Sequence, residues 1–178
     1  MKQSSALERL LRFDRELKYV YSLSDLAALF DESGNTLQST LKRLVRARIL
    51  SRAANGVFVF MHSQHLGSYT IERIAAVLRR CDYCYVSLES ALSEYGVISQ
   101  IPLDRITIMT TGVPGEFDTP FGVIEFTHTA RDVATVLDST VDVGRPLPMA
   151  TKLAAVRDLK RVGRNTHLIS ETELTDID

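Results

Sequence analysis

A single dipeptide, Asn55-Gly56, constrains the fold of this 178-residue chain more than any other local feature. It divides the run "ILSRAANGVFVF" into two segments rich in apolar residues, and Asn-Gly is a preferred two-residue turn between antiparallel strands. The run therefore predicts a β-hairpin. Because three helical patterns precede this hairpin, residues 1–61 are expected to form one small domain.

The three helical patterns are recognised by the spacing of their apolar residues. The first covers about residues 4–18, and the second, "SLSDLAALF", begins with Ser22 and Asp25 at the spacing of a capping box. The third follows the turn "DESGN" and is expected to begin with Asn35 as its cap. Its expected buried face consists of Leu37, Leu41, Leu44 and Val45. Three helices followed by a hairpin is the order of a winged helix-turn-helix.

The other face of the third predicted helix is polar and basic. The span from Thr36 to Arg52 contains five Lys or Arg residues and no acidic residue. Residues 1–52 contain ten Lys or Arg and six Asp or Glu, a net charge of +4, whereas the whole chain carries −1. A basic segment within a nearly neutral protein indicates a local anionic partner.

This basic face fits the major groove of DNA, which admits one helix and exposes the edges of the bases. We expect DNA contacts from Thr36, Gln38, Ser39, Lys42, Arg43 and Arg46 on the helix, and from Arg52 and Asn55 on the hairpin. The alternative is a winged helix that contacts only proteins and leaves its basic face in solvent.

The rest of the chain predicts a mixed α/β domain with a small sheet over residues 62–170, followed by an acidic tail at 171–178. "YTIERIAAVLRR" predicts a helix, and "CYVSLESALSEYGVI" predicts a strand and then a helix. Two further strands, "DRITIMTTG" and "GVIEFTHT", are expected on either side of a Gly- and Pro-rich loop, "VPGEFDTPFG". A last helix is expected to begin at Pro148 and end at Gly163. The predicted fold class is α+β.

A second basic group lies on that last predicted helix. Arg157, Lys160, Arg161 and Arg164 recur at the spacing i, i+3, i+4 and i+7, which places them on one side of a helix. They form either a solvated surface stripe, a second phosphate contact or a face for a protein partner.

Two cysteines and two histidines have the residue types of a structural zinc site. Cys81 and Cys84 form a Cys-x-x-Cys pair, and His62 and His65 lie upstream. The simpler interpretation is that the cysteines are small core residues and that the histidines lie on an interdomain loop. We therefore expect no metal and no cofactor.

Ser87, in "YVSLESALSEYG", lies where a strand pattern becomes a helix pattern. A nucleophilic serine needs a base within hydrogen-bond reach, and no Gly-x-Ser-x-Gly motif surrounds it. A helix N-cap is the simpler role, with the hydroxyl accepting a backbone N–H and Glu89 near the positive end of the helix dipole. Asp118 and Glu125 resemble part of a metal-dependent nuclease site, but Thr127 stands where such sites have lysine. We therefore expect no catalytic residues and no enzymatic activity.

The N-terminal segment and the length of the apolar runs indicate in which cellular compartment the protein is expected. The sequence has no run of 18 apolar residues, so no membrane helix is expected. Its N-terminal segment mixes charges at helical spacing and has no apolar signal core. We expect a cytoplasmic protein without membrane contact.

Four segments together resemble the AbiEi-type antitoxins, which are the antitoxin and transcriptional-regulator halves of bacterial abortive-infection systems. The segments are "YVSLESALSEYGVI", "ITIMTTG", "TPFGVIEFTHT" and "ATKLAAVRDLKR", and the resemblance extends over about residues 23–163. It implies a winged helix that binds inverted repeats in its own promoter and represses it, and a second domain that opposes the toxin. If two copies of the chain bind one inverted repeat, they form a homodimer on the DNA. The implied toxin is a nucleotidyltransferase-like protein encoded by the neighbouring gene.

The resemblance and the basic face lead to one functional expectation. The chain is expected to be an autorepressor and antitoxin that binds double-stranded promoter DNA. Under this resemblance the DNA contacts follow from position on the third helix, and the turn "FDESGN" before it is longer than a tight helix-turn-helix turn. The alternative is a protein-interaction module that binds its toxin or another acidic partner without sequence-specific DNA binding.

Overall fold

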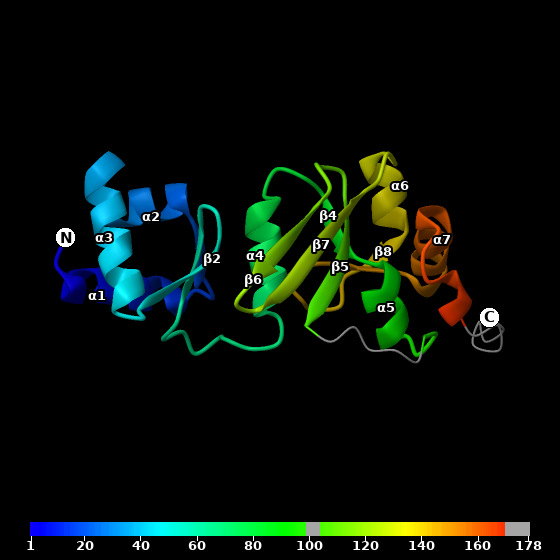
Figure 1. Cartoon of the computed structure of the whole chain (residues 1–178), viewed down its shortest axis with the longest axis horizontal. Coiled ribbons are helices and arrows are strands. Elements are labelled where there is room, and N and C mark those ends of the chain that lie inside the picture. The colour runs from blue at the N-terminus through cyan, green and yellow to red at the C-terminus, as the bar shows by residue number, and fades with distance from the viewer. Residues whose placement is uncertain (99–103, 170–178) are drawn as a thin grey trace. The chain divides into compact units, whose positions relative to one another are not determined.

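The computed structural model describes residues 1–98 and 104–169 (Figure 1). The chain forms two compact units, Met1–Leu78 and Arg79–Asp178. Each unit combines helices with a β-sheet, so the α+β class is confirmed. The expected boundary at residue 61 falls inside the first unit, because helix α4 (Thr70–Leu78) packs against strands β1 (Val20–Ser22) and β3 (Val57–Phe60).

The first unit places a three-stranded sheet beside its helices. Its elements in chain order are α1 (Gln3–Asp14), β1, α2 (Leu23–Phe30), α3 (Gly34–Arg46), β2 (Leu50–Ala54), β3 and α4. The strand order is β1-β3-β2, and both pairs are antiparallel. The predicted hairpin is confirmed as β2 and β3, whereas β1 was not predicted.

Local sequence explains where α2 begins and only partly where α3 begins. The capping box of α2 is confirmed, because Ser22 Oγ accepts the Asp25 N–H at 3.1 Å and Asp25 Oδ2 accepts the Ser22 N–H at 2.8 Å. The expected Asn35 cap of α3 is wrong. The N-cap is Ser33, because the helix already includes Gly34 and Asn35, and Ser33 makes no capping side-chain hydrogen bond.

The buried face of α3 differs from the prediction at one position. Leu37, Leu41 and Leu44 are buried as expected, but Thr40 is the fourth buried residue. Val45 is 36% exposed, because it lies at the rim of the groove described below.

Within residues 1–98 and 104–169, no helix has the length and apolar character needed to span a membrane.

The second unit contains a mixed six-stranded sheet in the order β6-β7-β5-β4-β9-β8. Its strands are β4 (Cys84–Val86), β5 (Arg105–Thr110), β6 (Gly115–Thr119), β7 (Gly122–His128), β8 (Thr140–Val141) and β9 (Met149–Ala150). Its helices are α5 (Leu88–Glu94), α6 (Val133–Asp138) and α7 (Lys152–Val162), followed by a 3₁₀ turn at Thr166–Leu168. Helix α5 packs against β5 and α7, so the "SLESAL" segment lies between the sheet and the last helix.

Two predicted segments of this unit are corrected. The expected loop "VPGEFDTPFG" contains β6, which pairs with β7 because Phe117 packs edge-on against Phe126 at 5.8 Å between ring centroids. Helix α7 begins at Lys152 rather than at Pro148, because Met149 and Ala150 extend as β9. Gly163, with φ +75°, ends the helix as predicted. The acidic tail at 171–178 lies outside the described residues.

Candidate nucleic-acid interface

The eight residues predicted to contact DNA are all exposed. Six of them lie on α3, opposite the face that packs Leu37, Leu41 and Leu44 into the core. The other two, Arg52 and Asn55, belong to β2 and to the turn of the hairpin. The exposed surface of α3 and the hairpin is therefore the polar, basic surface that the sequence predicted.

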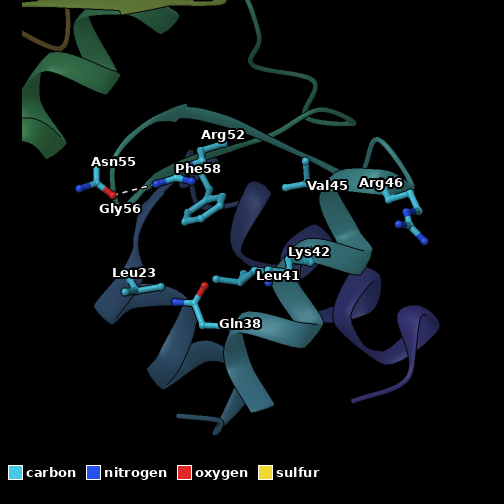
Figure 2. A pocket seen from close by; sticks show the side chains of 10 residues that line it. All are labelled: Leu23, Gln38, Leu41, Lys42, Val45, Arg46, Arg52, Asn55, Gly56 and Phe58. Atoms are coloured by element: carbon cyan, nitrogen blue, oxygen red, sulfur yellow. Dashed lines mark hydrogen bonds between the residues drawn. The ribbon is translucent and has the colours of Figure 1, made fainter. Parts of the chain in front are cut away.

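A groove of about 460 Å³ separates α3 from the hairpin (Figure 2). Its polar lining consists of Gln38, Lys42 and Arg46 from α3 and of Arg52 and Asn55 from the hairpin. Its apolar lining consists of Leu23, Leu41, Val45 and Phe58, with Gly56 at the turn. None of the described residues that line it is acidic, so the groove attracts anions.

Hydrogen bonds hold the hairpin side of the groove in place. The Arg52 Nη2 donates to Asn55 Oδ1 at 2.8 Å, and this bond is drawn in Figure 2. The Leu23 N–H, at the start of α2, donates to the Gly56 carbonyl at 2.8 Å. A guanidinium has five N–H donors, so Arg52 keeps donors for another acceptor while Asn55 fixes its direction.

The predicted DNA-contact residues form two groups on the surface. Gln38, Lys42 and Arg46 recur at i, i+4 and i+8, and they form one row along α3 that faces the groove. Thr36, Ser39 and Arg43 do not line the groove. At the 100° turn of an α-helix per residue, this outer group lies further round the same exposed arc.

Arg43 of the outer group already has protein partners. Its guanidinium donates to the Met1 carbonyl and, at 3.4 Å, to Thr40 Oγ1. Close to it, Glu32 pairs with the Met1 amino group at 2.5 Å, and this hydrogen bond is the main cause that lowers the pKa of Glu32. Arg43 therefore has fewer free donors for a phosphate than Lys42 or Arg46.

The basic group predicted on the last helix is divided by the end of α7. Arg157, Lys160 and Arg161 are exposed on α7. Arg164 follows the left-handed Gly163 and turns back into the unit, where it bonds both oxygens of Glu89 at 3.0 and 3.1 Å and pairs with Glu125. The expected shared face with Arg164 is therefore wrong, because the helix ends before that residue.

Ser87 belongs to a buried hydrogen-bond cluster. Its Oγ donates to Asp158 Oδ2 at 2.9 Å, and Tyr85 Oη donates to the same oxygen at 3.1 Å. Arg131 Nη1 pairs with the other carboxylate oxygen at 2.6 Å. The expected capping hydrogen bond is absent, since Ser87 is the N-cap residue of α5 but its side chain faces α7. Ser87 and Asp158 have 0% exposure, so a substrate does not reach this hydroxyl.

The neighbouring polar residues of "SLES" also bind within the unit. Glu89 lies in the first turn of α5, as predicted, but it is 8% exposed and accepts hydrogen bonds from Arg164 and Asn165, so it is a buried ion-pair partner rather than a surface residue. Ser90 and Thr107 exchange two hydrogen bonds, because each hydroxyl accepts the backbone N–H of the other residue at 3.0 and 2.9 Å. These contacts tie α5 to β5 and to the residues after α7.

The structure gives the metal and nuclease candidates other surroundings. Cys81 is exposed, whereas Cys84 is buried, and this burial raises the pKa of its thiol. In the described part of the chain, no group of three or more His, Cys, Asp and Glu side chains is arranged to hold a metal. Glu125 is paired with Arg105 at 2.8 Å and with Arg164.

Sequence reasoning missed the two residues that complete the Ser87 cluster. Asp158 lies between Arg157 and Leu159 on α7, where an acidic residue in the packed face is a signal of a buried partner. Arg131, between β7 and α6, had no such signal because its partner lies 27 residues further on.

The comparisons with known proteins bear on the fold. Neither protein-family models nor curated protein sequences gave a match to this chain. Among solved structures, the chain is similar to the RV2827C protein of Mycobacterium tuberculosis, with a TM-score of 0.61 and 16% sequence identity. The match covers 88% of this chain, which spans 60% of the length of that one. At this identity the likeness concerns the fold alone.

Proposed function

We propose that this protein is a DNA-binding transcriptional autorepressor and antitoxin of a bacterial toxin–antitoxin operon. In this proposal α1, α2, α3 and the β2–β3 hairpin form a winged helix-turn-helix that binds inverted repeats in the promoter. The observation that carries the proposal is the groove between α3 and the hairpin. It combines three cations with two amides, and its described lining contains no acidic residue.

Helix α3 is the proposed reader of the major groove. The row of Gln38, Lys42 and Arg46 extends over two turns of its exposed side. Amide side chains suit the edge of adenine, and Lys or Arg suit the edge of guanine or a phosphate. We assign base contacts to Gln38 and, near the same end of α3, to Thr36 and Ser39, and phosphate contacts to the cations further along the helix.

The hairpin is the proposed wing. A phosphate that enters the groove meets the Arg52 guanidinium, which Asn55 already holds at 2.8 Å. Because the side chain is ordered before binding, less conformational entropy is lost when the phosphate binds. The apolar lining, which includes Val45 and Phe58, suits the carbon atoms of a deoxyribose that accompanies the phosphate.

The antitoxin half of the proposal rests on the sequence resemblance to AbiEi-type antitoxins. The second unit would oppose a nucleotidyltransferase-like toxin, and two copies of the chain would bind the two halves of an inverted repeat. We propose no catalytic step for this unit. The burial of Ser87 and the ion pairs of Glu125 favour a structural role for the residues that first suggested chemistry.

The direct test is binding to the DNA upstream of the protein's own gene. Fluorescence anisotropy would compare that fragment with a scrambled fragment of equal length at moderate salt. We expect the native fragment to bind at least about a thousandfold more tightly, the lower range of specific over non-specific binding. Equal affinity for both fragments would reject autorepression. Co-purification with the neighbouring gene product, without DNA binding, would instead favour the protein-interaction module.

A further inference from the structure

A second cleft in the first unit lies between α1, β1 and α2. It encloses about 520 Å³, a volume within the range of small-molecule sites. Its lining shares no residue with the groove beside α3. The cleft therefore offers a ligand site that the proposed DNA contacts do not use.

Positive charge dominates the rim of this cleft. Arg9 and Arg12 lie one turn apart on α1, and Lys18 follows the helix. The acidic residue in its described lining is Asp25, whose Oδ2 accepts both the N–H and the hydroxyl of Ser22 at 2.8 and 2.9 Å. Its other oxygen lies 3.4 Å from Lys18 Nζ. Three cations therefore line the cleft together with one carboxylate, which already accepts hydrogen bonds from Ser22 and pairs with Lys18.

One of these cations is held in place by the protein. Arg9 Nη1 donates to the Leu29 carbonyl, in the last turn of α2, at 2.7 Å. Since a guanidinium has five donors, Arg9 is positioned while most of its N–H groups remain available. Arg12 is exposed at the same rim. Two guanidinium groups one helical turn apart suit the bidentate recognition of a phosphate.

The inner lining of the cleft is apolar and aromatic. Phe13 and Leu29 are half-buried there, and Tyr21 lies beneath them with 1% exposure. Tyr21 Oη donates to the Lys18 carbonyl at 2.6 Å, and burial raises the pKa of this phenol. Its hydroxyl is thus neutral and already hydrogen-bonded. The inner lining therefore offers a ligand apolar and aromatic surface.

We propose that this cleft binds a small aromatic phosphate of the size of a nucleoside monophosphate. The phosphate would contact Arg9, Arg12 and Lys18, and the aromatic ring would pack against Phe13 and Leu29. The proposal does not depend on the function proposed above, because the ligand and the contact residues are different.

Isothermal titration of the full chain with AMP tests this site without DNA. We expect saturable binding of AMP, and binding at least about tenfold weaker for adenosine and for inorganic phosphate, since each lacks one half of the contacts. Arg12→Ala is expected to weaken AMP binding by about tenfold, because it removes a charge-assisted hydrogen bond. Arg15→Ala, which removes an exposed cation outside the cleft, is the matched control and should leave AMP binding unchanged.

Three results would overturn the site. They are a lack of saturable AMP binding, equal binding by the Arg12→Ala and Arg15→Ala variants, and equal affinities for AMP and inorganic phosphate. Melting temperatures of both variants verify that the fold is retained. Since the titration contains no DNA, its failure leaves the promoter-binding proposal untouched, and a failure to bind promoter DNA leaves this site untouched.

Discussion

Ser87 Oγ donates a hydrogen bond to Asp158 Oδ2 at 2.9 Å across 71 residues of sequence. The contact joins the first residue before α5 to the middle of α7, and Tyr85 and Arg131 bind the same carboxylate. Because every member is at least four-fifths buried, this cluster fastens the last helix to the sheet rather than serving a substrate.

Replacing Ser87 by Ala is expected to lower the free energy of unfolding by about 1–3 kcal/mol, because the Asp158 carboxylate loses a donor in a buried site. Ser93→Ala, on the same helix and partly exposed, is the control and should change it by less than about 0.5 kcal/mol. Urea denaturation measures both. Equal losses in the two variants would mean that the hydrogen bond contributes nothing.

Stability at high pH should depend on Tyr85. Burial, followed by the charge of Asp158, raises the pKa of this phenol from 10.0 to about 12. The unfolded chain therefore releases the proton at lower pH than the native protein, so the contribution is complete below pH 10 and is lost as the pH rises from about 10 to 12. Denaturation between pH 8 and 12 should show a steeper loss for the native protein than for Tyr85→Phe. Parallel curves would contradict this assignment.

A side chain at Gly112 would displace the Asp82 carboxylate. A Cβ there would lie 2.1 Å from Asp82 Oδ2 and 2.3 Å from its Cγ, so the carboxylate has to move. We expect Gly112→Ala to cost at most about 1 kcal/mol of unfolding free energy, because the atoms in the way are the end of one partly exposed side chain, which can rotate. Gly115→Ala is the control, since its nearest neighbour would be 3.7 Å away. Adding Asp82→Ala should recover part of the loss, and a Gly112→Ala protein as stable as the control would show that Asp82 moves freely.

The two sides of the α3 groove should differ in what they contribute to DNA binding. Arg52→Ala is expected to weaken binding to native and scrambled fragments alike and to reduce the salt slope by about 1, because a phosphate contact is lost. Gln38→Ala should weaken binding to the native fragment alone and leave the slope unchanged. Anisotropy titrations over a salt series measure both quantities. If Arg52→Ala weakened binding to the native fragment alone, Arg52 would contact bases rather than phosphates, which would contradict this assignment.

The sequence predicted elements well where local chemistry decides them. The Ser22 capping box, the Asn55-Gly56 hairpin and the Gly163 stop depend on residues within a few positions of one another, and all three are present. The exposed arc of α3 was predictable for the same reason, because helical periodicity alone separates it from the buried Leu37, Leu41 and Leu44.

The errors come from contacts between distant segments. Ser87 bonds Asp158 instead of its own helix, and Arg164 turns toward Glu89, 75 residues earlier in the chain. The strand β6 lies in a Gly- and Pro-rich stretch and is held by pairing with β7. Likewise, the groove is lined by Leu23 and Gly56, whose backbone hydrogen bond joins segments 33 residues apart and is not contained in any local pattern.

The central claim is that α3 and the hairpin bind promoter DNA. The most direct measurement is a gel shift of the promoter fragment, at moderate salt, with the charge-reversed variant Lys42→Glu, Arg43→Glu, Arg46→Glu. All three side chains are exposed, but Arg43→Glu also removes the hydrogen bonds of Arg43 to Met1 and Thr40, so circular dichroism and melting have to show that the variant is folded. We predict that the native protein shifts the fragment and that the folded variant does not. An unchanged shift by the folded variant would contradict the account.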